Sequence, residues 1–309
     1  MSGRRTAATA VLPASLPTLL PVSLLVSLLA SAALTGCAAD DTPSADPARR
    51  AAAESSTGTT ATPSDETSAE PAKPTTAADY LALAGKAMAA QKGWRFAVRG
   101  DENLVLQGRT SGATYSATVR RTTGEPWALH STGNIRTSKG VTRSEAVYVV
   151  DGVGYVKESD AGWRHGPLSD PEIAAKVEDP LAALDAFEGY GEAVSHSASG
   201  RRIELRVRTA SAALPAVRDQ GVVRKALREL APTLKQLRAA GIAAPESGIT
   251  VERAEESLVL DSSTYRVVSH TFRCVLRIPS GTGSIRYGQE VTERTSGPYT
   301  GSVVLPEGA

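Results

Sequence analysis

The stretch Ala146-Val-Tyr-Val-Val-Asp-Gly-Val-Gly-Tyr-Val156 decides the fold class. Two runs of β-branched and aromatic residues, the types that favour strands, flank Asp151-Gly152. Asp-Gly between such runs is a strong signal for a two-residue type I′ turn, because both turn positions need a positive φ. The sequence therefore predicts an antiparallel hairpin over 146–156, with another strand edge or turn at Gly162-Trp163.

Alternation of apolar and polar residues predicts more strands before and after this hairpin. The predicted strands cover residues 94–99, 113–121, 203–208, 265–278, 285–291 and 302–305. In 203–208, Ile203, Leu205 and Val207 alternate with charged residues, which predicts one buried and one solvated face. Contact of that charged face with a wall polymer or an anionic headgroup is the alternative.

Helices are predicted over 78–92, in short pieces after Asp170-Pro171 and Asp179-Pro180, and within 211–240. The last region has an apolar stripe from Val223 to Leu237, typical of core packing, although a partner-binding helix or a cavity wall would show the same spacing. Pro232 predicts a kink or break at Ala231. Strands in runs, with helices between the runs, predict an α+β domain whose helices cover one face of an antiparallel sheet.

The N-terminal region has the features of a secretory signal. Arg4 and Arg5 precede an apolar stretch over 22–34, and Leu34-Thr-Gly-Cys37 follows. This tetrapeptide resembles the lipobox of bacterial lipoproteins, which implies a diacylglyceryl group on Cys37 and cleavage just before it. We therefore expect a signal peptide over 1–36 and a lipid anchor on the outer face of the cell membrane. The alternatives are a secreted protein with an incidental cysteine and an uncleaved N-terminal helix.

Composition separates a linker from a folded domain. Residues 37–77 are dominated by Ala, Thr, Ser, Pro, Asp and Glu and have almost no large apolar side chains, so they are predicted to be a disordered linker spanning about 35 Å. Residues 78–309 form the predicted single domain. Eight lysines among 34 basic residues, together with abundant alanine, indicate a high-GC genome such as that of an actinobacterium.

Charge and cysteine content exclude several classes of function. The leader has two basic and no acidic residues, so the mature chain has 32 basic and 33 acidic residues, a net charge of −1, with no basic cluster for nucleic acid. Apart from Cys37, Cys274 is the only cysteine, which excludes an intrachain disulfide framework and a cysteine-based zinc site.

Catalytic motifs are lacking in the sequence. The four histidines share no metal-binding spacing, and there is no phosphate-binding glycine loop or Gly-x-Ser-x-Gly elbow. We expect a protein that is not an enzyme and has no cofactor or metal, although a Ser/His/Asp arrangement assembled only in the fold stays open. His270, Phe272 and Cys274 share one strand face, where a buried cysteine beside a hydrogen-bonded histidine is expected and a metal pair is the alternative.

The hairpin Val147–Val156, the pair Gly162-Trp163 and the tail Val303-Val-Leu-Pro306 resemble the LolA/LppX-like lipoproteins of actinobacteria (the LppX, LprA, LprF and LprG type). The resemblance implies an incomplete β-barrel, in which a strongly curved antiparallel sheet has helices packed on its concave face. It also implies binding or carriage of a lipid or other amphiphile. The chain departs from this family in its low content of large apolar residues, with three Phe and two Met. The alternative is therefore a protein-interaction or wall-docking module on the same scaffold without a lipid cavity.

Overall fold

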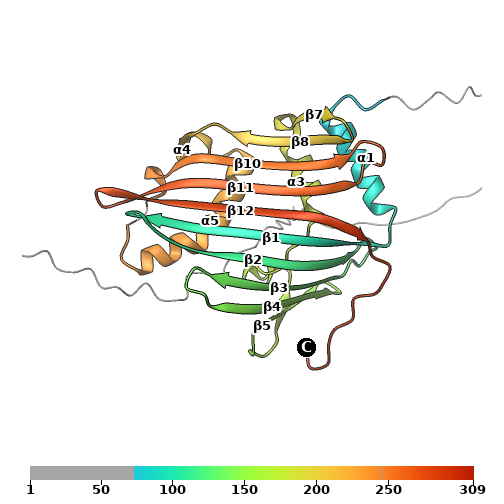
Figure 1. Ribbon diagram of the computed structural model, residues 1–309, viewed down its shortest axis with the longest axis horizontal. Helices are drawn as coiled ribbons and strands as arrows, with labels where there is room; N and C mark the ends of the chain where they lie inside the picture. Colours follow the sequence, from blue (N-terminus) through green and yellow to red (C-terminus); the bar gives the residue numbers. More distant parts are fainter. Residues whose placement is uncertain (1–72, 244) are drawn as a thin grey trace, which may run out of the picture.

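The computed structural model describes residues 73–243 and 245–309. Within them, one antiparallel sheet has the spatial order β6-β5-β4-β3-β2-β1-β12-β11-β10-β8-β7, and the short β9 pairs with β10. Figure 1 shows the strands from β5 to β7 side by side in this order. Its strands are β1 (Gly93–Leu106), β2 (Arg109–Thr122), β3 (Leu129–Thr137), β4 (Thr142–Val150), β5 (Val153–Glu158), β6 (Arg164–Pro167), β7 (Ser195–Ser199), β8 (Arg202–Thr209), β9 (Ala212–Ala213), β10 (Thr250–Asp261), β11 (Val267–Ser280) and β12 (Gly283–Pro298). The α-helices are α1 (Ala77–Ala89), α2 (Pro171–Ala174), α3 (Ala182–Tyr190), α4 (Leu214–Val217) and α5 (Gly221–Ala239).

The predicted hairpin is confirmed in its details. Val150 pairs with Val153, and the two residues between them, Asp151 and Gly152, have φ of 51° and 76°, as a type I′ turn requires. Gln107 and Gly108 repeat this geometry between β1 and β2, with φ of 49° and 75°. Gln107 is not a residue that favours positive φ, so the sequence carries only a weak signal for this second turn.

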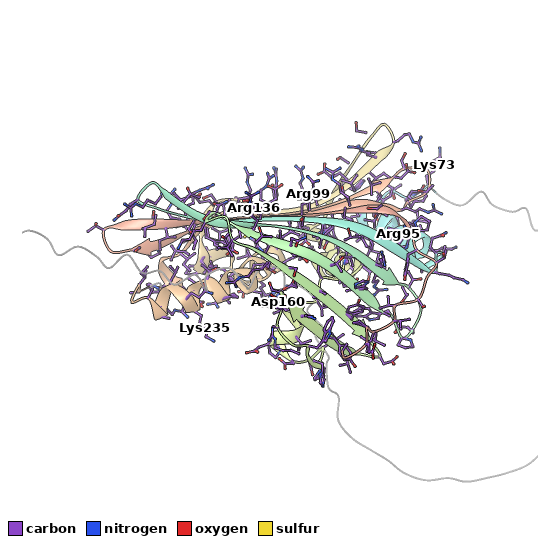
Figure 2. The ribbon with its side chains drawn as sticks, turned by 60° about the horizontal axis from the view of Figure 1, so that its bottom comes forward. Lys73, Arg95, Arg99, Arg136, Asp160 and Lys235 are labelled. Atoms are coloured by element: carbon purple, nitrogen blue, oxygen red, sulfur yellow. The ribbon has the colours of Figure 1, made fainter. Side chains whose placement is uncertain are left out.

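Helices cover the concave face of the sheet, which confirms the predicted fold class. In Figure 1, α3 and α5 lie behind the sheet, and Figure 2 shows the curved sheet with α5 beneath it. The core lies between these two layers, and it includes Trp94, Phe96, Phe187 and Leu230. The sheet does not close, because its path ends at β6 on one side and β7 on the other.

The helix boundaries follow local capping signals. Thr76 and Asp79 form a capping box at the start of α1, and the Asp170 side chain accepts a hydrogen bond from the backbone of Glu172 at the start of α2. The predicted break at Ala231 is wrong, because α5 runs continuously through Pro232. Leu230 and Leu234 are buried on either side of the proline, so packing on the core outweighs its local cost.

The predicted strand over 302–305 is also wrong. β12 ends at Pro298, residues 302–305 are not in a strand, and the side chain of Val304 is 72% exposed. Tyr299 still donates its backbone N–H to the Gly93 carbonyl at 2.7 Å, and then the chain leaves the sheet. β1 is already paired on both sides, by β2 and β12, so the tail finds no free strand edge there.

In the part of the chain that the structure describes, none of the helices has both the length and the apolar character needed to cross a membrane. The long apolar stripe of α5 instead faces the core, where Val223, Leu230, Leu234 and Leu237 are buried. Core packing of this helix, as predicted, is therefore confirmed. The predicted leader, residues 1–36, and residues 37–72 of the predicted linker lie outside the described residues.

Candidate functional site

Polar side chains form a layer within the core, between the sheet and the segments that cover it. We call these residues the buried polar layer: Glu102, Glu145, Glu256, His270, Gln289 and Glu293 of the sheet, with Lys176, Glu178, Lys225, Glu229 and Thr233 of the covering segments. Burial of a charge is costly unless the charge is paired and hydrogen-bonded. Which of these groups are paired therefore determines which of them are charged and which could bind a ligand.

Glu256 of β10 is the centre of the best-satisfied part of the layer. Lys225 Nζ and His270 Nε2 each lie 2.6 Å from Glu256 Oε1, and the Tyr190 hydroxyl donates to Glu256 Oε2. His270 Nδ1 lies 2.8 Å from Glu293 Oε2. With a carboxylate at each ring nitrogen, His270 is held as an imidazolium. Two cations thus balance two carboxylates.

The pKa values in this cluster follow from the pairing. Burial alone would lower the pKa of His270, but the hydrogen bonds to Glu256 and Glu293 raise it above its ordinary value. Burial opposes ionisation of Glu256, yet Lys225 and His270 lower the pKa of that carboxyl well below its ordinary value. His270 and Glu256 are therefore both ionised, and their opposite charges balance within the cluster.

A carboxyl pair lies beside this cluster. Glu178, in the segment between α2 and α3, hydrogen-bonds the side chain of Glu293, and burial together with the Glu293 charge raises the pKa of Glu178 well above its ordinary value. Glu178 therefore holds a proton and donates it to Glu293. Glu178 Oε2 is buried and has no hydrogen-bond partner among the described residues.

Residues on either side of Glu178 fasten the same segment to other strands. Lys176 Nζ lies 2.9 Å from Glu145 Oε2 of β4 and 2.8 Å from Glu158 Oε1 of β5. Asp179 makes a two-pronged pair with Arg121 of β2, with both N–O distances 3.0 Å. Residues 176–179, which we call the strap, are thus held on the concave face by charged contacts to four strands.

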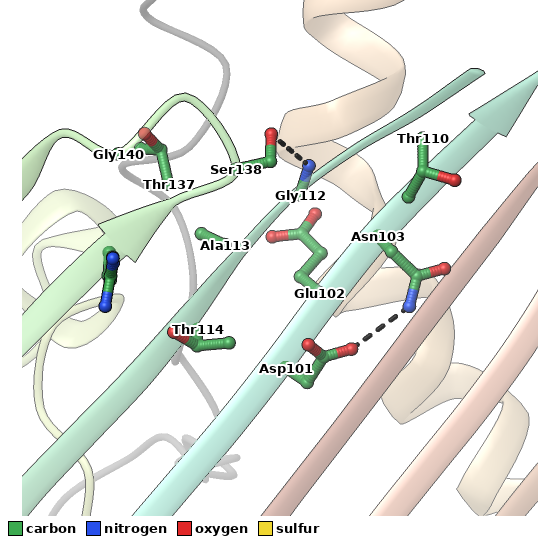
Figure 3. A pocket seen from close by; sticks show the side chains of 11 residues that line it. Asp101, Glu102, Asn103, Thr110, Gly112, Ala113, Thr114, Thr137, Ser138 and Gly140 are labelled. Carbon is green, nitrogen blue, oxygen red and sulfur yellow. Dashed lines mark hydrogen bonds between the residues drawn. The ribbon is translucent and has the colours of Figure 1, made fainter.

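One open pocket reaches the buried polar layer from outside. It has a volume of about 600 Å³ and lies where β3 ends beside the longer β1–β2 hairpin. Figure 3 shows its lining, which is largely polar: Asp101, Glu102, Asn103, Thr110, Gly112, Ala113, Thr114, Arg136, Thr137, Ser138 and Gly140. The Glu102 side chain points toward Gly112 and Ala113 of the neighbouring strand. Its carboxyl group is the buried acidic group of this pocket.

Glu102 is poised to change its charge near neutral pH. Burial raises its pKa to about 7, despite hydrogen bonds with Thr233 and Tyr287. Thr233 Oγ1 donates to Glu102 Oε1 at 3.2 Å. A carboxyl group with this pKa in a concave site can release a proton to a ligand or accept a hydrogen bond from one.

Hydrogen bonds connect the pocket with α5. The Tyr287 hydroxyl donates to Gln289 Oε1 at 3.1 Å, and Gln289 Nε2 donates to Glu229 Oε2 of α5 at 3.2 Å. Cys274 Sγ lies 4.0 Å from Gln289 Oε1, and burial raises the pKa of this thiol. Cys274 is therefore a buried thiol beside a polar relay, on the same sheet face as the hydrogen-bonded His270, as predicted. The described residues include no group of three or more His, Cys, Asp or Glu side chains placed to hold a metal ion.

The predicted anchor residue, Cys37, lies outside the described residues. Glu102, Glu256 and Glu293 were not predicted as site residues, although the sequence contains a signal for them. Each is an acidic residue at an inward position of an alternating strand; Glu102, for instance, continues the series Trp94, Phe96, Val98, Gly100. A charged residue in phase with an apolar face indicates a buried ion pair or a site.

Comparison with known proteins leaves the chain without a family. No protein-family model and no curated protein matches it. Among solved structures, a DUF1329 family protein from Desulfovibrio piger is 7% identical with a TM-score of 0.26, over 70% of this chain and 92% of that one. A β-barrel-like protein of DUF1849 from Brucella abortus is 11% identical with a TM-score of 0.23, over 67% and 99%. Likenesses this weak carry no conclusion about function.

Proposed function

We propose that this protein is a membrane-anchored, extracytoplasmic lipoprotein that binds an amphiphile by its polar head at Glu102. The observation that carries the proposal is the open pocket of about 600 Å³ with a buried carboxyl group whose pKa is about 7. Its volume is in the range of sites for small ligands, and its few fixed polar groups would orient the head of a ligand. The lipobox at Cys37 and the resemblance to LolA/LppX-like lipoproteins support the envelope location and the ligand class.

The pocket favours a polar or cationic head over an acyl chain as the bound part. Ala113 is the one aliphatic side chain in its lining, whereas Glu102, Asp101 and Asn103 offer acceptors. A carboxylate binds a cationic donor such as an ammonium group more strongly than a neutral one. The proposed role is binding and not catalysis.

The second candidate function is a docking module of the envelope without a lipid cavity. The observation in its favour is that the buried polar layer occupies the concave face with paired groups such as Glu256, His270 and Lys225. A lipid in that position would have to separate charges that are already satisfied, at high cost.

Binding of dodecylamine and dodecanoate to the purified chain, measured by calorimetry at pH 8, tests the proposal. We expect dodecylamine to bind and Glu102→Gln to weaken it about 10- to 100-fold, the usual worth of one charged hydrogen bond. Glu125→Gln, at an exposed residue of a loop, is the matched control and should leave binding unchanged. Equal affinities for the parent and Glu102→Gln, or no binding by the parent, would reject the site.

The anchor is tested in the same protein. Cys37→Ala should move the chain from the membrane fraction of cells to the soluble fraction, because two acyl chains are needed for stable anchoring. Retention of this variant in the membrane would contradict the lipoprotein assignment.

A further inference from the structure

Four exposed arginines lie together on the outer face of the sheet, opposite to the helices. They are Arg95 and Arg99 of β1, Arg120 of β2 and Arg294 of β12. Arg95 stands directly opposite Arg120, and Arg294 stands opposite Ala97, between Arg95 and Arg99. We call these four residues the arginine cluster; Figure 2 shows Arg95 and Arg99 on this face.

None of the four forms an ion pair with any described residue, in contrast to arginines elsewhere on the same face. Arg206 pairs with Glu204, Arg273 with Glu290, and Arg277 with Glu252. Like charges directly opposite each other on neighbouring strands destabilise a sheet. The cluster is thus a local excess of positive charge without intramolecular ion pairs, and it remains available to an anionic partner.

The guanidinium group of Arg95 is already held in place. Its Nε and one terminal nitrogen both donate to the Pro298 carbonyl at 3.3 Å. A guanidinium group that is fixed before binding loses less entropy when it pairs with a phosphate.

A row of aromatic rings continues from the cluster along the same face. Arg120 is opposite His130, His130 opposite Tyr148, Tyr148 opposite Tyr155, and Tyr155 opposite His165, on five successive strands. The His130 and Tyr148 rings stack with centroids 4.1 Å apart, and Trp163 meets Tyr148 edge-on at 5.6 Å. Tyr and Trp have an apolar body and a polar tip, which suits them to a membrane–water interface.

We propose that the arginine cluster and the adjoining aromatic row dock the domain on an anionic phospholipid membrane. Arginine matches the geometry of phosphate oxygens, and the Tyr and Trp rings match the headgroup layer. The described part of the chain begins at Lys73, which lies at the same end of the molecule as Arg95 (Figure 2). The inference rests on the proposed function in one respect only, namely that an anchor at Cys37 would hold this face near the bilayer.

Vesicle sedimentation with the full chain carrying Cys37→Ala tests this surface without the acyl anchor. The probes are vesicles of phosphatidylcholine alone and vesicles with three parts in ten of phosphatidylglycerol, each at low and at 0.5 M salt. We expect binding to the anionic vesicles, and Arg120→Ser/Arg294→Ser should weaken it about 25-fold, since each basic residue at an anionic surface contributes about fivefold. High salt should abolish the difference.

Two control variants separate this surface from net charge and from misfolding. Lys235→Ser removes a positive charge from the exposed side of α5, away from the outer face (Figure 2), and should leave vesicle binding unchanged. Arg120→Lys/Arg294→Lys keeps the charge and should retain most of the binding.

Three outcomes would overturn the proposal. They are equal losses for Lys235→Ser and the double serine variant, equal binding of the parent to neutral and anionic vesicles, and binding to soluble polyphosphate but not to vesicles. The last would assign the face to an anionic polymer. Because ligand binding at Glu102 is measured without membranes, either proposal can fail while the other stands.

Discussion

Glu256 shows how a single charged residue can be an integral part of a core. It is fully buried, and its two oxygens make three hydrogen bonds or ion pairs, with Lys225, His270 and Tyr190. Alternation in β10 predicts that position 256 faces inward, between Ala254 and Leu258. Lys225 of α5 and Tyr190 of α3 could not be predicted as partners, because they lie 31 and 66 residues away in the sequence. His270 lies on the next strand, β11, but its contact depends on the register of the β10–β11 pair.

Replacing Glu256 with Gln should cost the protein about 3–5 kcal/mol of unfolding free energy, because Lys225 and His270 would keep their buried charges without this carboxylate. Urea unfolding at pH 7 measures the loss. Glu255→Gln is the matched control, since its half-exposed side chain makes only long pairs of 3.8 and 3.7 Å with Arg253 and Arg273. The Glu255→Gln substitution should lower the unfolding free energy by less than about 1 kcal/mol. Similar losses for the two variants would contradict this account of the cluster.

At the scale of elements, β5 and α2 meet at a glycine. A Cβ atom added to Gly154 would overlap the Cγ2 atom of Ile173 in α2. Glycine therefore sets the distance between this helix and the sheet. Asp151-Gly152 made the hairpin of β4 and β5 predictable. The need for glycine at position 154 was not predictable, because it arises from contact with α2, which the sequence of the strand does not reveal.

Gly154→Ala should destabilise the protein by about 1–3 kcal/mol through overpacking. Hydrogen exchange of residues 171–177 should quicken, because α2 and the start of the strap must shift away from β5. Gly162→Ala offers the control, since a Cβ atom there meets nothing within 4 Å. If exchange over 171–177 were unchanged in Gly154→Ala, this contact would not hold α2.

For the whole molecule, the buried acids with raised pKa values predict stability that falls as pH rises above about 4.5. Glu102 has a folded pKa of about 7 against an ordinary 4.5, so between these values the native state binds more protons than the unfolded chain. Its contribution to stability is present below pH 4.5 and decreases by about 3 kcal/mol up to pH 7. Glu178 also has a raised pKa, so its contribution to stability likewise decreases as pH rises. The pKa of His270 is raised too, and its contribution decreases once the pH exceeds the ordinary histidine pKa of 6.5.

Thermal or urea unfolding between pH 4.5 and pH 8 checks this expectation. The parent should lose stability across the range, and Glu102→Gln, which mimics the protonated acid, should flatten the part below pH 7. Stability that rises steadily with pH, or an identical slope in the variant, would show that the Glu102 carboxyl is not buried as described.

Local signals in the sequence predicted the two layers of the molecule but not the strand order. Alternating apolar residues and capping residues such as Thr76 and Asp170 are local signals. The structure has a strand or a helix at most of the places that these signals indicate. The neighbour of β1 on one side is β2, which follows it directly, whereas on the other side it is β12. Nothing in the residues of either strand specifies that pairing, because it joins segments about 200 positions apart; the Arg95–Pro298 hydrogen bond spans 203.

The pairing of β1 with β12 also determines when the sheet can be completed. The first strand lies in the middle of the sheet and needs the last strand as a neighbour. During synthesis, β1 leaves the ribosome long before β12. Until residue 298 is available, the edge of β1 that pairs with β12 has no partner. The sheet can therefore be completed only after nearly all of the described chain has been made.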